Sequence, residues 1–196
     1  GQPAELVKLQ QQYVTLEPAL DAQEGERVTV DETAIEAARV KLLGNVTGDL
    51  GVNAGTTGTA TVDGAGSAWT NSGDLIVGDS GTGTLTIRNG GTVSNVAGYL
   101  GSLAGSTGTV TVDGAGSSWT SSSTLFVGRS GTGTLTIRNG GNVSNAGFGY
   151  LGFTAGTTGS ATVDGAGSTW TNSSTLIAGV SGTGTLTIKN GGKVSN

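Results

Sequence analysis

Short runs of alternating apolar and polar residues recur along residues 48–196 at a nearly constant spacing. A clear example is Thr84-Leu85-Thr86-Ile87-Arg88, in which Leu and Ile alternate with Thr. Successive side chains of a strand point to opposite faces, so this run predicts a strand with Leu85 and Ile87 inside and Thr86 outside. Related runs follow at steps of 25 residues, with one step of 26, at 59–63, 109–113, 134–138, 160–164 and 185–189.

Each step contains two further runs that are typical of short strands. One holds a bulky apolar residue that alternates between Trp and Val, and the other is an apolar run such as Leu125-Phe126-Val127-Gly128. Turns such as Asn89-Gly90-Gly91 separate the runs and suit a backbone with positive φ. Three short strands per step are typical of one coil of a parallel β-helix. The sequence therefore predicts an all-β parallel β-helix, a solenoid of about six coils of 25 residues over residues 44–196.

Equivalent residues of successive coils are expected to stack into ladders inside this solenoid. The expected apolar ladders consist of Leu85, Leu135 and Leu186, and of Ile87, Ile137 and Ile188. The three Trp residues, Trp69, Trp119 and Trp170, lie two coils apart with Val93 and Val143 between them, and should be buried. Close to them the chain places Asn71, Asn95, Asn145, Asn172 and Asn196, with Ser121 as the one departure. This stack predicts a ladder of side-chain amides between the coils.

The last outward position of the first strand alternates in charge from coil to coil. The residues are Asp63, Arg88, Asp113, Arg138, Asp164 and Lys189. Coils stack about 4.8 Å apart, so we expect a surface charge ladder in which each cation lies between two carboxylates and fixes the register. The alternative is the acid site of a polysaccharide-cleaving β-helix enzyme, because such sites use paired carboxylates. The regular recurrence of basic neighbours favours the structural interpretation.

Composition excludes several classes of chemistry. The chain has no Cys and no His, which excludes disulfides, thiol nucleophiles, Cys/His zinc sites and imidazole acid–base catalysis. The formal net charge is −5 and the nine Lys and Arg residues are scattered, which argues against nucleic-acid binding. We therefore expect no cofactor, no metal and no catalysis. The stacked Thr-x-Thr strands leave one further alternative, an ice-binding face of regularly spaced hydroxyl and methyl groups.

Residues 1–43 have a different composition and lack the repeat. Residues 3–13 predict one short helix, and the capping-box spacing in Thr29-Val30-Asp31-Glu32 predicts the start of a second, with Gly44 after its end. Three interpretations remain: a helical cap over the first coil, an oligomerising or partner-docking segment, and a foreign fusion segment. The chain stops at Asn196, in the repeat position of Asn95 and Asn145. We therefore expect a piece of a longer protein, whose export signals lie elsewhere.

Three motifs carry a resemblance to a known family. They are Thr-Val-Asp-Gly-Ala-Gly-Ser-x-Trp-Thr, Leu-x-Val-Gly-x-Ser-Gly-Thr-Gly-Thr-Leu-Thr-Ile and Asn-Gly-Gly-x-Val-Ser-Asn. Residues 48–196 thereby resemble the passenger repeats of bacterial autotransporters, the self-secreted, adhesin-like proteins of Gram-negative bacteria. The resemblance implies a right-handed parallel β-helix, display on the bacterial cell surface, a C-terminal membrane barrel and a role in adhesion and virulence. The helical residues 1–43 depart from the family's usual pattern.

The resemblance leads to the functional expectation of a non-enzymatic, extracellular structural and adhesive β-helix. Its partners would be a host-cell or bacterial surface component, or another copy of the chain. Candidate contact residues are those that vary between otherwise matching coils, because they are free of the shared structural role. They are Asp79, Leu103, Arg129, Phe148 and Phe153, of which Phe148 is the one inserted residue. The apolar members, expected to be exposed, are consistent with a contact surface, and the alternative is sequence drift on a turn that tolerates variation.

Overall fold

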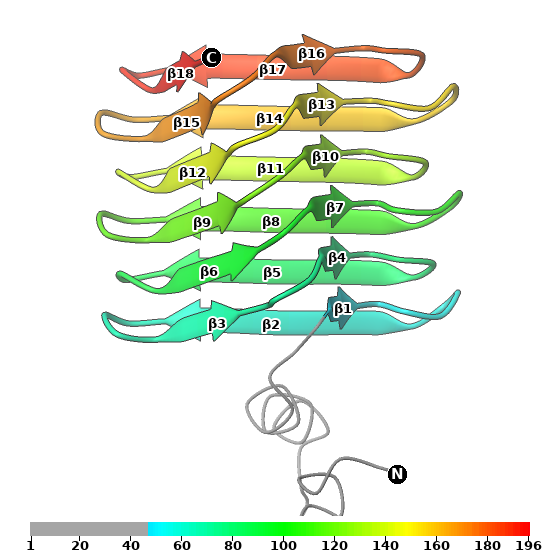
Figure 1. Cartoon of the computed structure of the whole chain (residues 1–196), viewed down its shortest axis with the longest axis horizontal. Coiled ribbons are helices and arrows are strands. Elements are labelled where there is room, and N and C mark those ends of the chain that lie inside the picture. Colours follow the sequence, from blue (N-terminus) through cyan, green and yellow to red (C-terminus); the bar gives the residue numbers. More distant parts are fainter. Residues whose placement is uncertain (1–46) are drawn as a thin grey trace, which may run out of the picture.

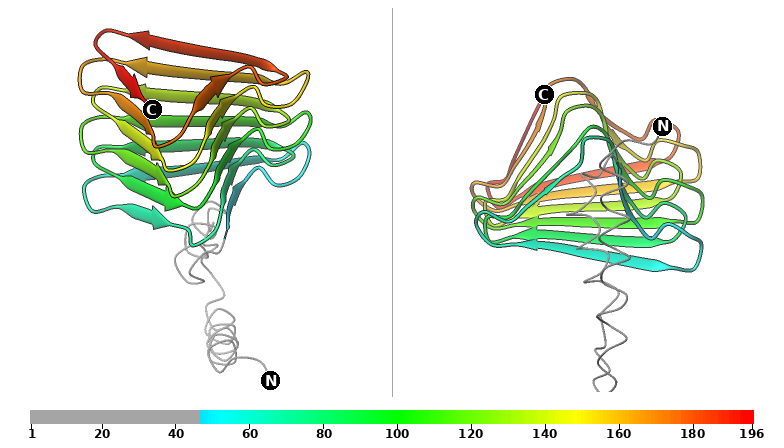
Figure 2. Two further views of the ribbon diagram at one scale, coloured as in Figure 1. Left: turned by 45° about the horizontal axis from the view of Figure 1, so that its top comes forward. Right: turned by 60° about the horizontal axis from the view of Figure 1, so that its bottom comes forward.

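The computed structural model describes residues 47–196, and over that range the chain forms a parallel β-solenoid of six coils (Figure 1). Each coil contributes one strand to each of three sheets, which enclose the interior on three sides (Figure 2). The predicted all-β parallel β-helix of about six coils is confirmed. The helices expected in residues 1–43 lie outside the described residues.

The three sheets contain six parallel strands each, taken from successive coils, which we number 1 to 6 along the chain, so that coil 1 contains β1 to β3 and coil 6 contains β16 to β18. Sheet A consists of β1 (Gly48–Leu50), β4 (Leu75–Val77), β7 (Gly98–Leu100), β10 (Leu125–Val127), β13 (Gly149–Leu151) and β16 (Leu176–Ala178). Sheet B consists of β2 (Thr57–Asp63), β5 (Thr82–Arg88), β8 (Thr107–Asp113), β11 (Thr132–Arg138), β14 (Thr158–Asp164) and β17 (Thr183–Lys189). Sheet C consists of β3 (Ala68–Thr70), β6 (Thr92–Asn95), β9 (Ser118–Ser121), β12 (Asn142–Asn145), β15 (Thr169–Asn172) and β18 (Lys193–Ser195).

The strands of sheet B stack so that equivalent residues pair directly, Leu85 with Val110 and Ile87 with Val112. Leu85 and Ile87 are completely buried, whereas the Thr residues of β5 lie on the outer face. The predicted orientation is therefore confirmed. The register continues the predicted ladder to Ile188, which pairs with Val163 and is 47% exposed. Strand β17 is the last of its sheet and has a neighbour on one side only.

The three Trp side chains lie in the core beneath sheet C, as predicted. Trp119 and Trp170 are completely buried, and Trp69 is 8% exposed. The indole N–H of Trp119 donates to Asn95 Oδ1 of the preceding coil at 2.6 Å, and that of Trp170 donates to Asn145 Oδ1 at 2.9 Å. Each of these two rings is thus both packed and bonded through its only polar atom, as a buried indole requires.

The Asn residues of sheet C stack as predicted, but the predicted amide-to-amide ladder is wrong. Asn95 and Asn145 accept indole N–H groups, and the amide of Asn95 donates to Ser121 Oγ at 3.2 Å. The physical reason is that Trp alternates with Val, so that only every second Asn has an indole in the next coil. Asn172 precedes a coil with Val194, and its buried amide has no hydrogen-bond partner.

Candidate functional site

A continuous column of mainly apolar side chains runs along the outer face of sheet A. It takes the middle residue of each strand, and the register aligns Asp49, Ile76, Tyr99, Phe126, Tyr150 and Ile177. In β10 the flanking Leu125 and Val127 are completely buried, while Phe126 is partly exposed. We refer to this column, with the turn residues Arg129, Phe148 and Phe153 that pack on it, as the aromatic face.

The aromatic rings of this face form one continuous stack. Phe126 lies parallel to Tyr99 at 5.2 Å between ring centroids, and Tyr150 stacks on its other side at 5.0 Å. Phe148 stacks on Tyr150 at 5.7 Å, and Phe153 meets the edges of Phe126 and Tyr150 at 5.1 and 5.0 Å. Each offset or edge-to-face pair contributes about 0.5–1.5 kcal/mol beyond the burial of area. All three Phe residues of the chain therefore gather on one outer surface.

A cation lies over this stack. The guanidinium of Arg129 is 5.1 Å from the ring centroid of Tyr99 and 6.0 Å from that of Phe126, which is a cation–π arrangement. Arg129 follows β10, and its amide N–H donates to Gly101 O of the preceding coil. Among the described residues, no ion pair joins Arg129 to a carboxylate.

The opposite end of the aromatic face is acidic. Partial burial raises the pKa of Asp49, and the neighbouring charges of Asp79 and Asp74 raise it further. Asp79 occupies the turn position of coil 2 that Arg129 occupies in coil 4, since both follow the Gly that ends the sheet A strand. The charges of the aromatic face are therefore separated along the rod. In residues 47–196 no group of acidic side chains has the arrangement needed to hold a metal ion.

The structure brings together three of the five candidate contact residues. Phe148 and Phe153 contact the ring stack and Arg129 covers it, whereas Asp79 lies two coils away on the same row of turns. Leu103 lies in the corresponding turn of the coil that follows Asp79, and its amide N–H donates to Asp79 O. Its side chain is 46% exposed and does not belong to the ring stack.

Sequence reasoning missed the centre of this face, namely Tyr99, Phe126 and Tyr150. Leu125-Phe126-Val127 is apolar at three successive positions, so the run alone does not show that its middle residue points outward. The available signal was strand alternation, because Leu125 and Val127 inside require Phe126 outside. Alignment of the other sheet A runs then places a Tyr on each side of it.

The stacking decides which chemistry this face can recognise. Both ring faces of Phe126 are covered by its neighbours, so the stack presents ring edges to its surroundings. A sugar that stacks on an aromatic side chain needs a free ring face, which this arrangement does not offer at its centre. Ring edges carry the positive end of the quadrupole and favour carbonyl oxygens, carboxylates and other aromatic rings. The centre of the aromatic face therefore offers ring edges, not ring faces, to its surroundings.

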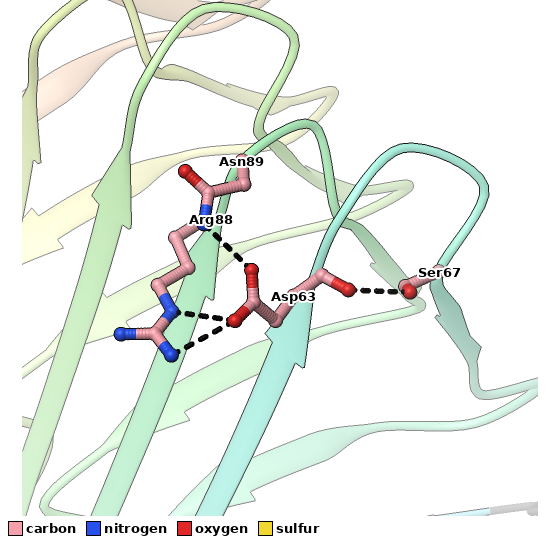
Figure 3. A network of polar contacts seen from close by, with 4 residues as sticks. All are labelled: Asp63, Ser67, Arg88 and Asn89. Carbon is pink, nitrogen blue, oxygen red and sulfur yellow. Dashed lines mark hydrogen bonds and ion pairs between the residues drawn. The ribbon is translucent and has the colours of Figure 1, made fainter.

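The outward charges of sheet B form separate pairs, not the predicted continuous ladder. Arg88 bonds Asp63 at 2.8 Å, Arg138 bonds Asp113 at 2.9 Å and Lys189 bonds Asp164 at 3.3 Å. Within the described range, no ion pair joins a cation to the Asp of the following coil. Asn89, at φ 54°, also donates to Asp63 Oδ1 at 2.7 Å, and Ser67 Oγ donates to the backbone oxygen of Asp63 (Figure 3). Asn139 and Asn190 repeat this contact with Asp113 and Asp164.

These contacts occupy the carboxylates, and for Asp63 and Asp164 they favour the ionised form. The hydrogen bond from Asn89, followed by that from Arg88, lowers the pKa of Asp63, and the bond from Asn190 does the same for Asp164. A general acid needs a carboxyl group whose pKa is raised, so the lowered pKa values argue against Asp63 or Asp164 as the acid of a glycosidase. The charged pairs thus join successive coils two by two, which favours a structural interpretation of them.

The outer face of sheet B carries a regular array of hydroxyl groups, which we refer to as the Thr face. Strand β8 contributes Thr107, Thr109 and Thr111, and the register aligns equivalent residues in all six strands. Three ranks of six give eighteen positions, of which only Ser160 is not Thr. The Thr-x-Thr pattern indicated two of these ranks, and the rank of Thr107 was missed.

Comparisons with known proteins identify no relative. The chain matches no protein-family model, and neither a characterised protein nor a solved structure gives a match. In the part of the chain that the structure describes, no helix has the length and apolar character to cross a membrane.

Proposed function

We propose that this chain is a non-enzymatic, extracellular β-helix of the autotransporter-passenger type, which extends from a bacterial cell surface. Its aromatic face would bind a surface component of a host or bacterial cell, or a second copy of the chain. The observation that carries the proposal is the gathering of five aromatic rings and one guanidinium on the outside of a rod. Contiguous exposed apolar groups on a polar protein mark contact surfaces.

Replacement of Phe148 and Phe153 together by Ser tests this proposal. Both rings pack on Tyr150 from turns, so their loss uncovers the stack without opening the core. Aromatic side chains dominate protein interfaces, and we expect the Kd for cells or for self-association to rise about tenfold or more. Binding to labelled cells and sedimentation velocity provide the measurements, with circular dichroism to confirm the β-rich fold.

A matched control is the double variant Thr86→Ala with Thr136→Ala, which removes side-chain atoms from the outer face of sheet B. It should bind as the wild type does. Equal binding by wild type and by the Phe148→Ser/Phe153→Ser variant would remove the aromatic face from the proposal. Release of reducing sugars from bacterial or host glycans would contradict the non-enzymatic part.

The Thr face favours a second candidate function, ice binding. Its three ranks form a two-dimensional lattice, with about 4.8 Å between coils and about 6.6 Å between ranks, from ordinary strand geometry. We expect thermal hysteresis in the wild type if this function holds, and a loss of at least about half of it in Thr111→Tyr, because one bulky ring in the middle breaks the flat array. The Phe148→Ser/Phe153→Ser variant is the control, since it leaves the Thr face intact. Wild-type protein that shows neither hysteresis nor ice shaping would exclude this candidate.

A further inference from the structure

The charges of the aromatic face are placed symmetrically about coil 3. Asp79 follows β4 in coil 2 and Arg129 follows β10 in coil 4, at equivalent turn positions. Tyr99 of β7 lies between their coils. A two-fold axis that runs along β7, between two facing copies of the chain, reverses the rod direction and keeps each row of turns opposite itself. Coil 2 of one copy then faces coil 4 of the other, and coil 1 faces coil 5.

We propose that a second copy of this chain occupies the aromatic face, in an antiparallel, two-fold symmetric dimer centred on Tyr99. Asp79 of each copy lies opposite Arg129 of the other, so the symmetric interface contains two such ion pairs. The same axis places Ile76 opposite Phe126, and Asp49 opposite the hydroxyl of Tyr150. The inference rests on the proposed function and specifies the partner and its orientation.

The local charges support this orientation. Arg129 has no carboxylate partner within residues 47–196, and it is exposed above the ring stack. At the other end, partial burial and then the nearby charges of Asp79 and Asp74 raise the pKa of Asp49, so a cation from a second copy would relieve the repulsion among these carboxylates. In a parallel pairing, each of these charged residues would instead lie at the same level along the rod as the identical residue of the other copy. Isologous interfaces are self-complementary in this way.

The ring stack supplies the apolar centre of such an interface. The two stacks meet at Tyr99, whose ring edge suits an edge-to-face contact with Tyr99 of the other copy, and on each side of it Phe126 packs on Ile76 of the other copy. Phe148 is 43% exposed and lies beside Tyr150, so it extends the apolar area towards the end of the face. Charged groups at its border then select the antiparallel orientation over others.

Charge reversal in the full chain tests this arrangement, with sedimentation equilibrium as the measurement. In a dimer of Arg129→Asp, each of the two facing pairs would consist of two acidic side chains, and in a dimer of Asp79→Arg each would consist of two basic side chains. Each single variant should therefore raise the dimer Kd about tenfold or more. The double variant Asp79→Arg/Arg129→Asp restores opposite charges and should return the Kd to within about threefold of the wild type. An equimolar mixture of the two single variants should form a heterodimer, because both of its pairs are then attractive.

Each outcome decides the inference. Wild type that remains monomeric at all accessible concentrations overturns it. If the Phe148→Ser/Phe153→Ser variant then still loses cell binding, the aromatic face keeps its proposed function with a partner other than this chain. Single variants that weaken the dimer without recovery in the double variant or in the mixture overturn the antiparallel arrangement. Recovery in both, together with a dimer Kd that rises with salt, supports it.

Discussion

Replacement of Trp119 by Ala is expected to lower the free energy of unfolding by about 3–5 kcal/mol, as truncation of a fully buried aromatic ring does. Trp119 is completely buried between Val93 and Val143 of the adjoining coils. Its loss opens a cavity in the middle of the rod and leaves Asn95 Oδ1 without the indole donor. Both effects act in the same direction.

Urea denaturation followed by circular dichroism measures the change. The matched variant is Trp119→Phe, which keeps a ring but removes the N–H, and should cost less than Trp119→Ala. In a solenoid the loss of stability can also appear as local opening of the coils around the cavity, so hydrogen exchange of β6, β9 and β12 should accelerate first. Near-wild-type unfolding of Trp119→Ala would show that this ring is not a core element.

The coil architecture follows from the sequence because it depends on local rules. In a run such as Thr84-Leu85-Thr86-Ile87, the alternation determines which side chains point into the core and which point to solvent. The constant spacing of the runs then stacks each strand on the equivalent strand of the next coil. Burial of Leu85, Ile87 and the three Trp residues was predictable for that reason. Ile188 has the same register but is 47% exposed, because β17 has a neighbouring strand on one side only, so burial depends on the adjoining coils as well as on the alternation.

The hydrogen bonds and ion pairs depend on details that a repeat pattern does not contain. Stacking alone places Arg88 equally well beside Asp63 and Asp113, yet the structure pairs it with Asp63. Likewise the amides of the Asn stack were expected to bond one another, and it is the side chain of the neighbouring coil, Trp or Ser, that decides their partners. Such choices require three-dimensional geometry.

The candidate binding surface was predictable only at its border. Phe148 and Phe153 stood out because matching coils differ at these positions, whereas Phe126 belongs to a run that is apolar throughout and so indicates burial. The register of sheet A is what places Phe126 between Tyr99 and Tyr150. A surface built from one residue of each of several coils is thus not apparent in the sequence of any single coil.

Replacement of Gly108 by Ala is expected to destabilise the rod by about 3 kcal/mol or more, at the upper end of the cost of overpacking. Gly108 lies in β8 with its missing side chain directed at the preceding turn. A Cβ there would overlap Val77 O and lie 2.5 Å from Gly101 N, and both are backbone atoms that cannot rotate away. The same position is Gly in all six strands of sheet B.

The control for this variant is Gly105→Ala, three residues earlier in the same coil. Gly105 has a φ of +81° but open space around it, so Ala there should cost only about 1–2 kcal/mol for the unfavourable backbone conformation. Thermal unfolding of the two variants side by side separates the need for space from the need for positive φ. If Gly105→Ala proved as destabilising as Gly108→Ala, backbone conformation would explain both and the close approach of the two backbones would not be the cause. If Gly108→Ala unfolded at the wild-type temperature, the tight contact between β8 and the turns beside it would be contradicted directly.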